Sequence, residues 1–144
     1  MSVVTRMAKA VADELNRDQE FSVPFDAAFS VKPGYELKEL DTIRVIVVPK
    51  TLEIERVSRI SAKYLVTVDI GVMQRFGKMT PEEAVETLGD LVDEIADFLS
   101  DRPLEEFKAA TFVSIINDPI YVPEFLTQQR TFMSVLTVRY VLLK

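Results

Sequence analysis

The side chains with the clearest chemical potential are carboxylates that recur four residues apart between residues 80 and 101. They form three pairs: Glu82 and Glu86, Asp90 and Glu94, and Asp93 and Asp97. In a helix, residues four apart lie on one face, so these carboxylates would gather on one side. Such a cluster could hold Mg²⁺ or Ca²⁺, and the chemistry to expect would be metal-dependent hydrolysis.

Two other interpretations of these acids stay open. We define the acidic face as Glu82, Glu86, Asp90, Asp93 and Asp97. A solvated helix surface explains it without any ligand, because acids at this spacing repel by only roughly 0.2–0.5 kcal/mol per pair. A basic partner surface, such as a neighbouring subunit, would also neutralise it. No compact loop of alternating acids resembles a calcium site.

The residue types on which many enzymes rely are absent from the chain. It has no histidine and no cysteine, which excludes Ser-His and Cys-His arrangements, thiolate zinc sites and disulfides. Its four glycines are scattered and form no phosphate-binding loop. A net charge of -6 argues against affinity for nucleic-acid phosphates. These absences disfavour a catalytic function, and we assign no catalytic residue, no metal ligand and no cofactor-binding residue.

The acidic face belongs to an amphipathic helix predicted over residues 80–101. Thr80 is placed to cap the helix, Pro81 suits its first position, and Glu83 completes a capping box. Apolar residues recur every three or four positions and predict a stripe that packs on a sheet. The stripe consists of Val85, Leu88, Val92, Ile95 and Leu99.

Periodicity also predicts the remaining elements. Residues 3–16 have the pattern of a second helix. Alternating or β-branched stretches predict strands at residues 21–31, 42–48, 62–76, 107–116 and 131–143. Pro24 lacks a backbone donor and favours an edge position for the first strand. Lys32 to Tyr35 has the composition of a turn, and one helical turn is expected after Pro123.

The order of these elements predicts a single α+β domain spanning residues 1–144. Strands outnumber helices, and most neighbours are joined by short links, which favours an antiparallel sheet. We expect a mostly antiparallel sheet with two helices packed on one face and a protruding hairpin arm. No apolar run approaches the roughly 20 residues that a membrane-spanning helix needs, so no membrane association is expected.

Residues 50–61, which we call the arm, are a candidate interaction segment. Charged and apolar residues alternate there between two predicted strands. The candidates for contact are Lys50, Leu52, Ile54, Arg56 and Arg59. The arm is either an ordinary surface hairpin or a segment laid on an adjacent subunit, where backbone pairing would provide adhesion.

A second candidate interaction segment follows a turn at residues 117–119. It places aromatic residues in a loop that prolines hold in shape. The candidates for contact are Tyr121, Glu124, Phe125, Gln128 and Arg130. The loop either tucks its aromatic rings into the core or presents them to a partner, as interfaces often do.

The chain as a whole resembles a known family. A first helix ending in LN precedes FSVPFDAAFSVKPGYELKELDTIRVIVVPK, then come the arm, YLVTVDIGVMQRF, the acidic helix and NDPIYVPEFLTQQRTFMSVLTVRYVLLK. This order, with the stretches DTIRVIVVP and NDPIYVPE, is similar to the small neck proteins of long-tailed bacteriophages, in particular the tail terminator or tail-completion group. The resemblance covers nearly the whole chain.

This resemblance implies a structural virion protein with no enzymatic activity and no cofactor. Such proteins form a hexameric ring that caps the finished tail tube and faces the head connector. The implied partners are further copies of the chain, the tail tube protein and the head-tail connector protein. DNA would pass through the lumen without sequence-specific binding, and the ring would be assembled in the host cytoplasm as part of the virion neck. A head-tail connector or adaptor is the alternative, and a metal-dependent enzyme is the less favoured one.

Overall fold

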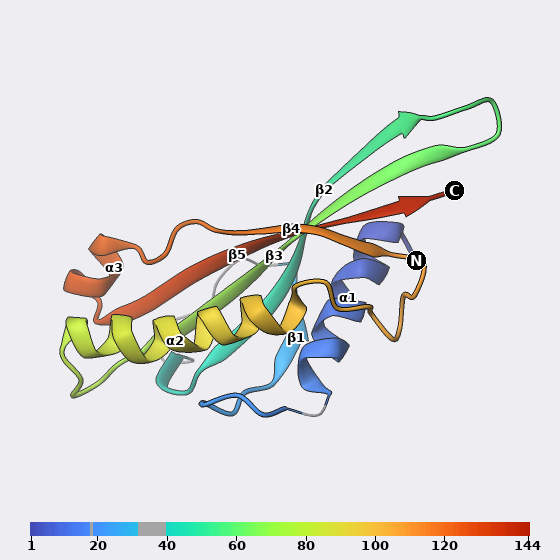
Figure 1. The fold of residues 1–144 in the computed structure, drawn as a ribbon. Coiled ribbons are helices and arrows are strands. Elements are labelled where there is room, and N and C mark those ends of the chain that lie inside the picture. Colours follow the sequence, from blue (N-terminus) through green and yellow to red (C-terminus); the bar gives the residue numbers. More distant parts are fainter. Residues whose placement is uncertain (18, 32–39) are drawn as a thin grey trace.

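The structure is a computed structural model, and it describes residues 1–17, 19–31 and 40–144. Along the chain the elements are α1 (Val3–Asn16), β1 (Ala27–Phe29), β2 (Arg44–Arg56), β3 (Ala62–Arg75), α2 (Pro81–Leu99), β4 (Thr111–Asn117), α3 (Pro123–Gln128) and β5 (Thr131–Leu143). The five strands form one sheet in the order β1-β2-β3-β5-β4. β1 runs parallel to β2, and the other neighbours are antiparallel. The predicted α+β fold with a mostly antiparallel sheet is confirmed (Figure 1).

The two long helices begin at side-chain caps. The hydroxyl of Ser2 accepts a hydrogen bond from the Thr5 backbone N–H at 3.2 Å, and Thr80 accepts one from Glu83 at the same distance. Each cap satisfies a donor that has no partner within the first helical turn. The helix predicted over residues 3–16 is α1, and the helix predicted over residues 80–101 is α2 with Thr80 as its cap.

Both long helices pack on the same face of the sheet. Every second residue of the central strands points toward them: Val66, Val68, Ile70 and Val72 of β3, and Leu136, Val138, Tyr140 and Leu142 of β5. These side chains form one buried cluster with the apolar stripes of α1 and α2. A smaller cluster of Leu40, Ile46 and Met73 lies on the opposite face. The main core therefore lies between the sheet and the two helices.

The strand predicted over residues 21–31 is much shorter in the structure. Only Ala27–Phe29 pairs with a neighbour, and the predicted period-two pattern is wrong for the residues before it. Phe21 turns toward α2, and its ring centroid lies 5.2 Å from that of Phe98. The backbone N–H of Ser22 donates to the Glu94 carboxylate at 3.0 Å. Side chains rather than a neighbouring strand thus hold this extended segment.

Two other strands also have boundaries that differ from the predicted ones. The strand predicted to end at residue 48 continues as β2 to Arg56, and therefore includes most of the arm. Backbone hydrogen bonds of 3.1 Å from Phe107 to Leu104 and from Ala110 to Phe107 wind the preceding chain into turns, so β4 starts at Thr111. The helical turn expected after Pro123 is α3. The turn predicted at residues 32–35 lies outside the described residues.

Candidate functional site

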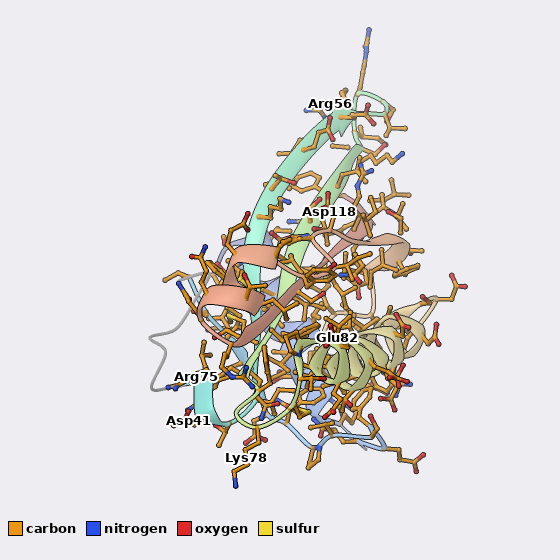
Figure 2. All side chains as sticks on the ribbon, turned by 90° about the vertical axis from the view of Figure 1, so that its left-hand side faces the viewer. Asp41, Arg56, Arg75, Lys78, Glu82 and Asp118 are labelled. Carbon is orange, nitrogen blue, oxygen red and sulfur yellow. The ribbon has the colours of Figure 1, made fainter. Side chains whose placement is uncertain are left out.

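The arm is a two-stranded ribbon that extends beyond the helices. β2 and β3 remain paired as far as Arg56 opposite Ala62, and residues 57–61 close the turn. The backbone N–H of Val57 donates to the carbonyl of Ser61 at 3.1 Å, and the hydroxyls of Ser58 and Ser61 lie 2.9 Å apart. Figure 1 shows the hairpin standing clear of α1 and α2, and Figure 2 shows Arg56 near its far end. The tip therefore has a defined shape without support from the rest of the domain.

A bulge controls which side chains the arm displays. The register shifts between Pro49 and Thr51, so Leu52 and Ile54 keep to the same sheet face as the buried Val47. A bulge inserts one extra residue into a strand, so the alternation of inward and outward side chains shifts by one position there. Apolar residues stay on one face across the bulge only if the apolar pattern in the sequence shifts by one position as well. Leu52 and Ile54 are exposed, as they lie beyond the helices that cover Val47. Their exposure leaves an apolar strip on the arm.

The charged candidate contact residues on the arm differ in how firmly their side chains are held by other parts of the chain. The Lys50 ammonium lies 3.5 Å from the Asp69 carboxylate, which also accepts a hydrogen bond from Thr137 at 2.6 Å. Arg56 reaches the backbone carbonyl of Arg59 at 3.5 Å, and both side chains are exposed near the tip. Lys50 is therefore held against the sheet, and the positive charge available to a partner is concentrated at the tip.

The second candidate segment contributes a short helix at the other end of the sheet. Glu124 and Gln128 are exposed on α3, Tyr121 is exposed just before it, and Phe125 is half-buried. The anchor that enters the core is Leu126, whereas the sequence suggested the aromatic rings of Tyr121 and Phe125 for that role. The loop thus tucks in an aliphatic side chain and leaves Tyr121 accessible.

The side chain of Arg130, a predicted contact residue, forms hydrogen bonds within its own chain. Its guanidinium donates to the carbonyl of Gly77 at 3.1 Å through Nε and to that of Met79 at 2.6 Å, and it lies 4.9 Å from the ring centroid of Phe76. Gly77 adopts a positive φ of 52°, which glycine tolerates without strain. Arg130 therefore fastens the start of β5 to the turn that leads into α2.

We expect Arg130→Lys to lower the free energy of unfolding by about 1 kcal/mol. An ammonium cannot reproduce the fork of donors that binds two carbonyls while stacking on a ring. Urea denaturation would measure the loss, and hydrogen exchange should accelerate first at residues 77–80. Gln128→Lys, on the exposed side of α3, is the matched control and should change stability by less than about 0.5 kcal/mol. Equal stability of the two variants would contradict the fastening role.

The acidic face lies on the solvent side of α2. All five of its carboxylates are exposed, and Figure 2 shows Glu82 at the beginning of the helix. Glu94 differs from them, since it bonds to the backbone and the hydroxyl of Ser22 and holds residues 21–26 against α2. Within the described ranges, no three acidic side chains come close enough to hold a metal ion. The structure thus offers an extended negative surface rather than a coordination site.

The two interaction segments lie at opposite ends of the sheet. β3 and β5 pair from Lys63 opposite Leu143 at the arm end to Arg75 opposite Thr131 at the α3 end. Figure 1 shows the arm and α3 pointing away from each other along this direction. The predicted contact residues therefore form two separate surfaces and not one site.

Several exposed apolar residues on these surfaces were not predicted as contacts. On the arm they are Val57 and Ile60, and near the second segment they are Val113, Ile116 and Ile120. Ile60 is 91% exposed at the tip of the arm, and Ile116 is 57% exposed on β4. A signal was present in the sequence, because residues 111–117 contain no charged residue. We call Val113, Ile116, Ile120 and Tyr121 the β4 surface.

An ion pair with a buried carboxylate joins α1 to the segment that follows α2. The Glu14 carboxylate, only 2% exposed, accepts hydrogen bonds from Arg102 Nε at 2.7 Å and from the Glu105 backbone N–H at 3.0 Å. Burial alone would raise the pKa of Glu14, but these bonds and the positive charges of Arg102 and Arg17 hold it below its ordinary value of 4.5. Burial, followed by the charge of Glu14, raises the pKa of the Tyr140 phenol. The network links α1 to the chain that leaves α2.

No protein-family model matches this chain, and no curated protein matches it significantly. Among the residues that the structure describes, no helix combines the length and the apolar character needed to cross a bilayer.

Proposed function

We propose that this chain is a structural protein of the neck of a long-tailed bacteriophage, namely a tail terminator that forms a ring on the end of the tail tube. The observation that carries the proposal is a pair of separate exposed apolar surfaces: the arm, which projects from one end of the sheet, and the β4 surface, which lies along the edge strand that β5 separates from the arm strands. A ring subunit needs two different contact surfaces, because each copy must bind a neighbour on either side. The resemblance of the sequence to tail terminators agrees with this arrangement.

The charge distribution supports the same proposal. The chain carries a net charge of -6, and the acidic face leaves five carboxylates exposed on α2. A ring through which DNA passes works best if its wall does not attract phosphates, and a negative surface meets that need. The acidic face is therefore proposed to line or border the channel, without sequence-specific contact to DNA.

The decisive experiment is to add the purified protein to assembling tail tubes of its own phage and to measure tube lengths by electron microscopy. We expect rings at one end of each tube and no further growth of the capped tubes. Tubes that grow at the same rate with and without the protein would contradict the proposal. Co-purification with the portal or connector, and not with the tube protein, would instead identify a head-tail connector.

A further inference from the structure

The free edge of β4 is the least protected edge of the sheet. β4 pairs with β5 on one side, and in the described sheet no strand pairs with its other side. Its seven residues include no charge and no proline, which are two of the usual devices against edge-to-edge association, but a third device is present as a bulge between Phe112 and Ser114. The opposite edge differs: β1 has three residues, and beyond it β2 carries Pro49, Lys50, Glu53 and Glu55. β4 thus leaves the apolar side chains of Val113 and Ile116 open to contact by a partner.

The β4 surface extends from this edge into a corner that is held in place. The side-chain amide of Asn117 donates to the Ser134 hydroxyl at 2.8 Å and to the Val135 carbonyl at 2.9 Å. The backbone N–H of Asp118 also donates to Val135, at 2.9 Å. Ile120 and Tyr121, which follow directly, are therefore presented on a fixed backbone. Preorganised apolar residues lose little entropy when a partner binds.

The arm tip carries positive charge beside its apolar residues, which residues 111–129 lack. Residues 56–61 carry two bases, Arg56 and Arg59, and no acid, while Val57 and Ile60 are exposed between them. Residues 111–129 carry two acids, Asp118 and Glu124, and no base. Both surfaces are therefore apolar at their centres, and the two bases of the arm tip can pair with Asp118 and Glu124, which favours one surface binding the other. Arg139 of β5, opposite Ser114, is a base beside the β4 surface and sets the side on which the arm tip would not be favoured.

From this complementarity we propose that the arm tip of one copy docks on the β4 surface of a second copy through its exposed apolar and basic side chains. The arm is a paired ribbon that projects away from the rest of the sheet, so its tip cannot fold back onto the β4 surface of its own copy. The contact is heterologous, and repeating it builds a ring. The inference rests on the proposed function only in taking the partner to be another copy of this chain.

The test uses two variants with one charge placed on each surface. Ile60→Asp disables the arm tip, and Ile116→Asp disables the β4 surface. Sedimentation velocity should show self-association of the wild-type chain and its weakening by about 30-fold in either variant, the loss expected for one central contact residue. Val31→Asp changes an apolar residue outside both surfaces whose 75% exposure lies between those of Ile60 and Ile116, and this variant should assemble like wild type.

Mixing the variants provides the more specific readout. Ile60→Asp retains an intact β4 surface and Ile116→Asp retains an intact arm, so an equimolar mixture should form heterodimers at concentrations where each variant alone stays monomeric. A chain carrying both substitutions should form no dimer with Ile60→Asp. Because the chain has no cysteine, Ile60→Cys and Val113→Cys introduced into separate chains should also form a disulfide between copies on oxidation.

The outcomes that overturn the inference are distinct from failure of the proposed function. A wild-type chain that stays monomeric at the highest attainable concentration overturns the inference, even if the protein still caps tail tubes. Normal assembly of either aspartate variant, or a mixture that gives no heterodimer, does the same. If either aspartate variant shows a changed circular dichroism spectrum, the corresponding serine variant takes its place in the same scheme.

Discussion

Leu88→Asp is expected to abolish folding at neutral pH. Leu88 is 1% exposed, in the middle of the α2 stripe that packs on the sheet. Removing a buried leucine side chain costs about 2–5 kcal/mol, and a buried carboxylate without a partner costs several more. This sum is comparable to the total stability of a domain, which is about 5–15 kcal/mol. Circular dichroism should show loss of the cooperative thermal transition.

Glu86→Gln is the matched control on the other face of the same helix. Glu86 is exposed, and the acids one turn before and after it, Glu82 and Asp90, have the same charge. Removing one charge relieves two repulsions of roughly 0.2–0.5 kcal/mol each, so stability should stay level or rise slightly. Equal destabilisation by Leu88→Asp and Glu86→Gln would mean that the buried and exposed faces of α2 are assigned wrongly.

The elements that the sequence predicted best are long and locally specified. Val3–Asn16 and Thr131–Leu143 have their predicted boundaries, and α2 has its predicted cap at Thr80. In each case the periodicity extends over a dozen or more residues, so small local deviations do not hide it. Capping depends on nearby residues and can therefore be read from the sequence without knowledge of the tertiary structure.

The prediction of a strand over residues 21–31 was wrong for most of its length. An alternating pattern does not reveal which groups form hydrogen bonds with the backbone N–H and carbonyl groups. In the structure the backbone N–H and carbonyl of Ala27 are both bonded to the side chain of Asn16, at 2.8 Å each. Gln19 donates to the carbonyl of Phe25 at 2.8 Å. These partners come from α1 and the chain after it, and only the tertiary fold brings them to this segment.

The candidate surfaces could be predicted only as segments. The sequence indicated the arm, but the bulge at Pro49 to Thr51 decides that Leu52 and Ile54 share a face with the core. The edge position of β4 follows from the strand order, which no local pattern specifies. Arg130 was predicted as a contact residue because it follows an aromatic loop, and the structure places its guanidinium on Gly77. Partner surfaces depend on register and topology, and these are properties of the whole sheet.

Arg102→Met should lower the free energy of unfolding by about 3 kcal/mol at pH 7. The substitution leaves an apolar side chain over Phe98, whose ring centroid lies 3.9 Å from the guanidinium, but it removes the partner of the buried Glu14 carboxylate. Breaking one side of a buried pair costs about 3–5 kcal/mol, and the lower end applies because Arg102 is about one-third exposed. Lys108→Met removes an exposed pair with Glu105 and should cost about 0–1 kcal/mol.

The pH dependence distinguishes lost charge pairing from lost packing. In the wild-type chain the folded pKa of Glu14 lies below the ordinary 4.5, so its contribution to stability is complete above that pH and is lost as the pH falls through the folded pKa. In Arg102→Met the lowering effect of the guanidinium is gone, so burial raises the pKa of the Glu14 carboxyl relative to wild type. Protonation of Glu14 at lower pH then removes the buried, unpaired charge and stabilises the folded variant. The two stability curves should therefore converge below pH 4.5 in urea titrations. A gap that stays constant with pH would mean that packing, rather than the Glu14 charge, accounts for the loss.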